Sequence, residues 1–199
     1  MGYTTILDII GSVIIGGLIM LILFRMSDAA SQNTYNNSQE LVVQTNLTTI
    51  VGILENDFRR IGYCKLYNKI PISNTAIISA DSTSISFLTD TKNNGDVDTL
   101  SYYVGPTSEL SATPNPNDRL LYRVVNNETP KSINVGLTEF KLLYFDTWGD
   151  TLSFPITTTK AITSIQISIQ IEDAEAYGNE YVSAFWRQIR LAARNLTNR

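Results

Sequence analysis

The sequence predicts an α+β protein in which a long N-terminal helix packs on an antiparallel β-sheet domain. Three observations lead to this prediction. An apolar run, GYTTILDIIGSVIIGGLIMLILF, occupies residues 2–24. The segment that follows, up to residue 62, places apolar residues at helical spacing, and from residue 63 onward they recur at every second position. We therefore divide the chain into residues 1–24 (a transmembrane helix half), 25–62 (an amphipathic helix half) and 63–199 (an antiparallel β domain).

The first segment has the length and composition of a membrane span. One carboxylate, one serine and three glycines are the only interruptions in residues 6–24. As a helix, this stretch would rise about 28 Å, close to the roughly 30 Å of a bilayer's hydrocarbon core. A cleaved secretory signal is the alternative, but such signals have a positive charge before the apolar run, and here none precedes it. Cleavage would give a mature chain that begins near Ala30.

Residues 25–62 predict a continuation of the same helix. Residues 25–40 are polar and contain neither Pro nor Gly. One stripe of the following segment is apolar, and Gly62 then supplies a helix C-cap. We expect one helix from about residue 4 to residue 61, with its weakest helix propensity at residues 33–38. The residues of the apolar stripe are Leu47, Ile50, Val51, Leu54, Phe58 and Ile61.

The remainder predicts an antiparallel sheet of six or seven strands. Alternating or β-branched segments occupy residues 84–90, 98–105, 119–126, 139–146, 163–172 and 184–193. Turn sequences lie at residues 92–96, 113–118, 125–130 and 147–150. The clearest strand alternates isoleucines at 165, 167, 169 and 171 with Ser and Gln, which predicts one buried face. We expect the amphipathic helix half to cover that face of the sheet.

Composition excludes several classes of function. The net charge is −4 and no basic block occurs, so nucleic-acid binding has no support. The chain has no histidine and a single cysteine, Cys64. These counts exclude catalytic arrangements that need histidine, most zinc sites and any internal disulfide. No pair of carboxylates is placed as a general acid and base. We therefore expect no enzyme activity, no catalytic residue, no small-molecule substrate and no cofactor other than the calcium considered next.

The stretch DTKNNGDVD is the candidate metal site. Asp90, Asn94, Asp96 and Asp98 have the spacing of an oxygen-rich calcium loop with a glycine at its turn. However, Lys92 stands where such a loop would offer another oxygen, and no glutamate closes it. A hairpin turn through Asn94 and Gly95 explains the same residues without a metal. Calcium is the minor alternative.

The stretch DTWGD at residues 146–150 also has two interpretations. Asp146, Trp148 and Asp150 around Gly149 have the chemistry of a carbohydrate-stacking patch. The same residues are typical of a tight turn between two strands, which is the interpretation we favour.

The residues GYTTILD at the start of the chain, together with this architecture, resemble a known family, the type IV pilins and pseudopilins. In that family a glycine precedes the prepilin-peptidase cleavage site, and an aromatic residue, a threonine, two apolar residues and a glutamate follow. Here the acid is Asp8, one position later, and the leader would be only Met1 and Gly2. The sequence ENDFRRIGY resembles the end of the long helix in large minor pilins and J-type pseudopilins. LSYYVG, RLLYRVV and IRLAARN resemble their strands.

The resemblance implies a structural subunit whose N-terminal helix is part of a filament core. The filament would be a type IV pilus or a type II secretion-like assembly, with this chain as a minor or tip subunit, and its partners would be other pilin-like subunits. Such a subunit spans the inner membrane once, and then stands in a periplasmic or cell-surface filament. Prepilin peptidase would cleave between Gly2 and Tyr3.

The resemblance also gives Asp8 a role, as the partner of another subunit's N-terminal amine. A buried carboxylate is strongly unfavourable without a partner, and with one it specifies register more than it adds stability. In the alternative, Asp8 lies among wet lipid headgroups. Tyr3 would lie in the same assembly contact, and Gly11, Gly16 and Gly17 would let helices approach closely.

Two other functions remain open. The first is a membrane-tethered β domain that binds a carbohydrate or mediates adhesion, with the helix as a mere tether. The second is a secreted β protein after signal cleavage. Replacement of Asp8 by Asn distinguishes assembly from tethering, and N-terminal sequencing of the mature chain identifies cleavage.

Overall fold

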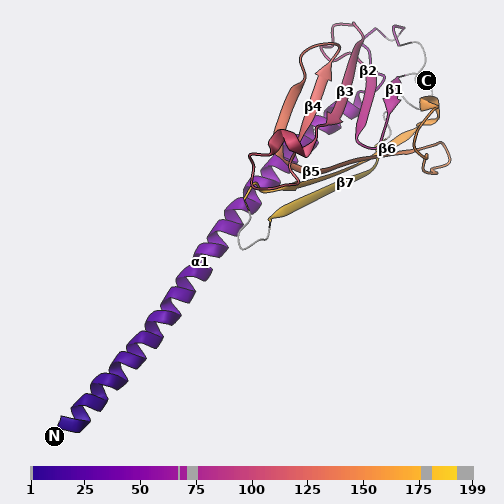
Figure 1. Cartoon of the computed structure of the whole chain (residues 1–199). Coiled ribbons are helices and arrows are strands. Elements are labelled where there is room, and N and C mark those ends of the chain that lie inside the picture. Colours follow the sequence, from indigo (N-terminus) through magenta and orange to yellow (C-terminus); the bar gives the residue numbers. More distant parts are fainter. Residues whose placement is uncertain (1, 67, 71–75, 176–180, 192–199) are drawn as a thin grey trace. The chain divides into compact units, whose positions relative to one another are not determined.

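The structure is a computed structural model that describes residues 2–66, 68–70, 76–175 and 181–191. It confirms the α+β layout: one N-terminal helix, α1 (Gly2–Arg59), precedes a curled, seven-stranded antiparallel sheet (Figure 1). The chain forms two compact units, Met1–Gln39 and Glu40–Arg199, so the division falls within α1.

Helix α1 is continuous, and its end lies close to the predicted one. Residues 33–38, where helix propensity is weakest, are helical. After Arg59 the chain forms a tighter turn than an α-helix, because the amide of Ile61 donates a hydrogen bond to the carbonyl of Phe58, three residues back, at 3.2 Å. Gly62 has a φ of +73°, a conformation that glycine adopts at no steric cost. Its amide then donates to the carbonyl of Leu88 at 2.8 Å, which ties the helix end to the sheet.

The sheet is a meander in which each strand pairs with its neighbours in the sequence. Turns between consecutive antiparallel strands keep the pairing local. Short 3₁₀ helices, η2 (Thr107–Leu110) and η3 (Thr159–Ala161), precede β4 and β6. The strands are β1 (Ile77–Ala80), β2 (Ser84–Thr89), β3 (Asp98–Val104), β4 (Arg119–Val125), β5 (Lys131–Phe145), β6 (Ser164–Glu172) and β7 (Ser183–Leu191).

The six strands expected from the sequence all exist, with two differences. Strand β1 was not predicted individually, and β5 begins eight residues earlier than expected, at Lys131 instead of Glu139. Gly136 explains the second difference, because a glycine in an alternating pattern reads as the end of a strand. It has a φ of +75°, and the pairing register shifts beside it, between Leu137 and Glu139. Residues 192–193 of the last predicted strand lie outside the described residues.

Strand β5 curls the sheet. Its first half pairs with β4, and its second half pairs with β6 (Figure 1). The amide of Leu142 donates to the carbonyl of Ser82 at 2.8 Å, and the hydroxyl of Tyr144 donates to the carbonyl of Asp81 at 2.9 Å. These bonds join β5 to the β1–β2 turn, so the first hairpin of the meander is held against its fifth strand.

The core lies between the sheet and residues 43–61. The four alternating isoleucines of β6 are completely buried, as their period predicts. The ring of Phe58 packs against Phe87 and Tyr102, with centroids 5.6 and 5.8 Å apart. The amphipathic half of the helix therefore covers the sheet, as expected. Its buried apolar residues, with the one that follows α1, are Val43, Ile50, Leu54, Phe58 and Ile61.

Candidate functional site: the exposed apolar segment of α1

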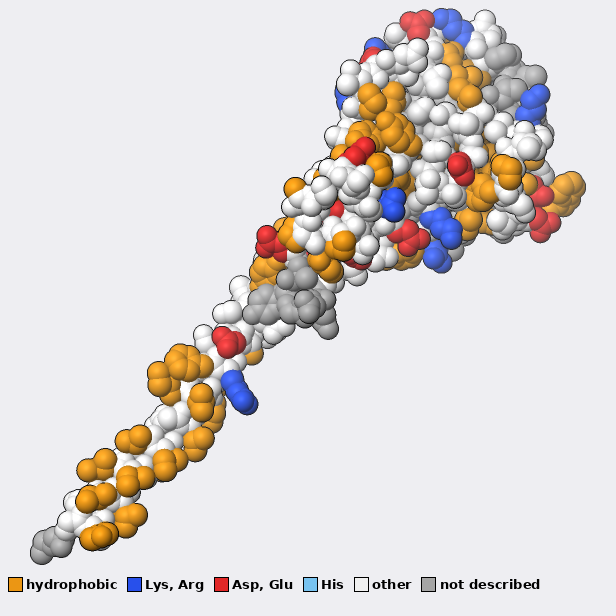
Figure 2. Space-filling model, in the orientation of Figure 1, with side chains coloured by type: hydrophobic (Ala, Val, Ile, Leu, Met, Phe, Trp, Pro, Cys, Tyr) orange, Lys and Arg blue, Asp and Glu red, His pale blue; other side chains and the backbone are white. Residues whose placement is uncertain are grey.

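The first part of α1 exposes apolar side chains on every side. Leu18–Phe24 covers nearly two helical turns with large apolar residues, so these side chains point in all directions around the axis. Figure 2 shows hydrophobic side chains along the visible face of this segment. The large apolar residues, each 51–87% exposed, are Tyr3, Ile6, Leu7, Ile9, Ile10, Val13, Ile14, Ile15, Leu18, Ile19, Met20, Leu21, Ile22, Leu23, Phe24 and Met26.

This segment makes α1 long and apolar enough to span a membrane, and its apolar window is not buried within the chain. Two hydroxyl groups in it donate hydrogen bonds to carbonyls of the helix itself. The Ser12 hydroxyl donates to the carbonyl of Ile9 at 2.8 Å, and the Thr5 hydroxyl donates to that of Gly2 at 3.0 Å. Such bonds reduce the cost of placing hydroxyl groups in an apolar surrounding.

Asp8 is the one carboxylate in this segment. Its side chain is exposed, and none of the ion pairs among the described residues includes it. The pairing of Asp8 with another subunit's amine stays a prediction, as does peptidase processing between Gly2 and Tyr3. The Tyr3 side chain is exposed at the start of the helix, and its role in assembly also stays a prediction.

The three glycines within residues 6–24 make no close contact with the part of the chain that the structure describes. A Cβ atom added at Gly11, Gly16 or Gly17 would meet nothing within 4 Å. Glycine also lowers helix stability by about 1 kcal/mol relative to alanine. Their presence is consistent with close approach of a neighbouring helix, which small residues permit.

A buried ionic network, which sequence reasoning missed, joins α1 to the sheet. Asp57 lies on the buried stripe of the helix and is 6% exposed. Its Oδ2 accepts hydrogen bonds from the Tyr102 hydroxyl of β3 at 2.6 Å and from Nε of Arg123 of β4 at 2.7 Å. Nε of Arg123 also lies 3.2 Å from the Tyr102 hydroxyl. A signal existed in the sequence, since position 57 lies on the same helix face as Ile50, Leu54 and Ile61.

The environment of this network shifts two pKa values. Burial raises the pKa of Tyr102, and the negative charge of Asp57 raises it further. Burial alone would lower the pKa of Arg123, but its hydrogen bond and attraction to Asp57 outweigh burial, and the net pKa is raised. Both shifts keep Tyr102 a neutral phenol and Arg123 a guanidinium. The network therefore holds the helix on β3 and β4 in one register.

The candidate calcium residues form the β2–β3 turn. The Asp90 carboxylate accepts hydrogen bonds from the amides of Gly95 at 2.8 Å, Asn94 at 3.1 Å and Lys65 at 3.2 Å. Burial raises the pKa of Asp90, but these backbone donors outweigh burial and the net pKa is lowered. Gly95 has a φ of +88°, so the predicted turn is confirmed.

The other oxygens of this turn also have partners. Asp98 accepts hydrogen bonds from Thr91 and from the Asn126 amide, and Asp96 pairs with Nζ of Lys69 at 3.0 Å. Within the described part of the chain, no group of three or more Asp, Glu, His or Cys side chains is placed to hold a metal ion. The turn accounts for these residues, and the calcium alternative stays untested.

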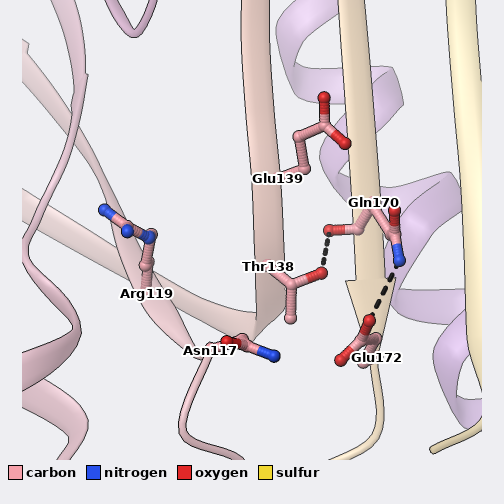
Figure 3. Close-up of a pocket in the computed structure, with 6 residues that line it drawn as sticks. All are labelled: Asn117, Arg119, Thr138, Glu139, Gln170 and Glu172. Carbon is pink, nitrogen blue, oxygen red and sulfur yellow. Dashed lines mark hydrogen bonds between the residues drawn. The ribbon is translucent and has the colours of Figure 1, made fainter.

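A shallow depression of about 280 Å³ lies on the outer side of β4, β5 and β6. Its Thr138 hydroxyl donates to the Gln170 carbonyl, and the Gln170 amide donates to Glu172 (Figure 3). The carboxyl groups of Glu139 and Glu172 lie at opposite ends of the residues drawn (Figure 3). The lining residues are Asn117, Arg119, Thr138, Glu139, Gln170 and Glu172.

Beside this depression, two carboxylates are buried without full hydrogen bonding. Asp118 is 2% exposed and Asp173 is 5% exposed, and one oxygen of each has no hydrogen-bond partner among the described residues. Burial raises the pKa of Asp118. A hydrogen bond from Thr113 opposes this shift, and the charges of Glu172 and Asp173 add to it. Burial likewise raises the pKa of Asp173. Both groups therefore favour the protonated form more than an exposed aspartate does.

The Asp146–Asp150 segment forms the predicted tight turn after β5. Oδ1 of Asp146 accepts hydrogen bonds from the amides of Trp148 and Asp150, at 3.0 and 2.9 Å. Gly149 has a φ of +87°, and its amide donates to the Asp146 carbonyl at 3.1 Å. The Trp148 side chain is 87% exposed at this turn.

Neither protein-family models nor curated proteins match this chain.

Proposed function

We propose that this protein is a non-enzymatic, pilin-like structural subunit. Its N-terminal helix would cross the inner membrane once and then bundle with the helices of other pilin-like subunits. The product would be a periplasmic or cell-surface filament of the type IV pilus or type II secretion kind, with this chain in a minor or tip position. The observation that supports this proposal is the exposure of apolar side chains all around residues 3–26.

The arrangement of these side chains bears on the kind of partner. Burial of one large aliphatic side chain is worth about 1.5–3 kcal/mol, so exposure of the whole segment to water would be very unfavourable. A single partner on one side would leave the other sides exposed. Lipid surrounds a helix completely, and so does a bundle of several helices. In the proposed function, lipid surrounds the helix before assembly, and the helices of other subunits surround it in the filament.

The two parts of α1 suit different tasks. Residues 43–58 are anchored to the sheet by buried apolar residues and by the Asp57 network. Among the described residues, none anchors the first part in this way, and Asp8, Gly11, Gly16 and Gly17 lie there. In the proposed filament, Asp8 would meet the N-terminal amine of a neighbouring subunit within the apolar bundle. A carboxylate left there without a partner costs about 3–5 kcal/mol, so only the paired register would persist.

An assembly assay of Asp8→Asn tests the proposal. Cells that express the full chain are sheared, and the chain is quantified in the released filaments and in the membrane. We expect Asn at this position to leave the neighbouring subunit's buried amine without a counter-charge, so the protein should stay in the membrane and its filament fraction should fall about a hundredfold, as a loss of about 3 kcal/mol implies. Asp28→Asn, at an exposed position of the same helix outside the apolar run, is the matched control and should assemble normally.

Two results would contradict the proposal. If Asp8→Asn leaves both fractions unchanged, the helix is a tether for an independent β domain. If N-terminal sequencing finds a mature chain that starts near Ala30, the apolar segment is a cleaved signal. An intact Met1 or a start at Tyr3 agrees with assembly.

A further inference from the structure

The turn at residues 146–150 presents an unusual surface. Trp148 is 87% exposed, whereas Trp186 of β7 is partly buried against the core. Indole rings favour sites where they are at least partly removed from water. A tryptophan that stands this far out on a folded domain is therefore typical of a contact residue.

The turn holds the Trp148 backbone rigidly. Two amides bind the same oxygen of Asp146, and the Asp146 amide donates to the Asp150 carbonyl at 3.0 Å. Phe145 and Thr151 form a β-bridge just outside the turn. A partner would therefore order little backbone when it binds, which reduces the entropic cost of association.

The charged residues of this turn are all negative. Residues 146–154 contain two aspartates and no Lys or Arg. No ion pair among the described residues includes Asp146 or Asp150, and only one oxygen of Asp146 is engaged by the turn. Anionic lipid headgroups would be repelled by these carboxylates. A neutral sugar would stack on the ring and donate hydroxyl hydrogen bonds to the carboxylates, but it would bring no positive charge to neutralise them.

We propose that the Trp148 turn, residues 146–150, docks an arginine-bearing surface of a partner protein. A guanidinium stacks on an indole face and at the same time donates hydrogen bonds to adjacent carboxylates. Trp148 provides the ring, and Asp150 and the free oxygen of Asp146 provide the acceptors. This inference goes beyond filament assembly, because it concerns a surface of the β domain and requires no contact through the apolar helix.

Binding of a fluorescein-labelled hexa-arginine peptide tests the inference. The full chain is held in polyoxyethylene detergent micelles, which carry neither charge nor sugar, and the peptide's anisotropy is followed. We expect binding that weakens with added salt, since the pair is exposed to solvent. Trp148→Ala should lower the affinity about tenfold, as for an interface hot spot. Asp150→Asn should lower it about threefold, as for an exposed ion pair.

Matched variants separate this site from general attraction to an acidic protein. Phe185→Ala removes another exposed aromatic ring, and Glu128→Gln removes an exposed carboxylate in a different turn. Both should bind the peptide as the wild type does. The inference is overturned if Trp148→Ala binds normally or if Glu128→Gln is as weak as Asp150→Asn. It is equally overturned if the protein binds cellohexaose or anionic vesicles through Trp148 but not the peptide.

Discussion

Replacement of Asp57 by alanine is the sharpest test of how the helix is held on the sheet. The substitution removes the acceptor that Tyr102 and Arg123 share. The phenol hydroxyl stays buried and loses its acceptor, and the guanidinium stays near the core without a counter-charge. Because the two partners lie on different strands, the loss weakens the attachment of α1 to both β3 and β4.

The expected magnitude follows from these contacts. A buried hydroxyl without its acceptor costs about 1 kcal/mol or more. Removal of one partner from a fully buried ion pair costs about 3–5 kcal/mol, and the 24% exposure of the Arg123 side chain places this case below that range. Together we expect a loss of about 3 kcal/mol in the free energy of unfolding. For a protein of this size, the melting temperature should fall by about 6–12 °C.

Urea and thermal unfolding of the full chain in detergent micelles, followed by circular dichroism, measure this loss. Glu55→Ala is the control, because its ion pair with Arg59 on the helix surface has a distance of 4.0 Å and should contribute little. In the double variant with Arg123→Ala, the cost should be smaller than the sum of the two single costs. A loss below about 1 kcal/mol for Asp57→Ala, or one equal to that of Glu55→Ala, would refute this account of the network.

Two further predictions concern Gly136 in the sheet and the buried carboxyl group of Asp118. Gly136→Ala should lower the free energy of unfolding by about 3 kcal/mol or more, so the protein should unfold at a markedly lower urea concentration. The reason is that residue 136 has a φ of +75° and that the new Cβ would lie 2.1 Å from the carbonyl oxygen of Glu172. Asp118→Asn should raise the free energy of unfolding by about 1 kcal/mol at pH 8, and this gain should disappear near pH 3. The pKa of Asp118 is raised in the folded state, so its charged form destabilises the fold, and wild-type stability falls as pH rises through that pKa. A melting-temperature difference between this variant and the wild type that does not change with pH would contradict the second prediction.

Much of the fold could be predicted because it depends on local periodicity. The stripe that includes Leu54 and Phe58 indicated which side of the helix is buried, and the alternation from Ile165 to Ile171 indicated the same for β6. In both cases the covalent geometry of the element determines which side chains share a face. The turn at Asn94 and Gly95 could be predicted for a similar reason, since those residues tolerate positive φ.

Other features depend on contacts between distant residues. The first half of β5 could not be predicted because Gly136 interrupts its alternating pattern, and the pairing with β4 is what defines that half as a strand. Position 57 lies on the buried face of the helix, but its partners Tyr102 and Arg123 are 45 and 66 positions away, so the network itself could not be predicted.

By itself, the sequence determined that a long apolar helix segment precedes an amphipathic one, and that strands with one buried face follow. It could do so because each of these features repeats within a few residues. Only the tertiary structure decided how the sheet curls through β5, which charges are buried between helix and sheet, and that Trp148 is left exposed. Those outcomes depend on which distant segments come into contact, and the local periodicity of the sequence does not determine these contacts.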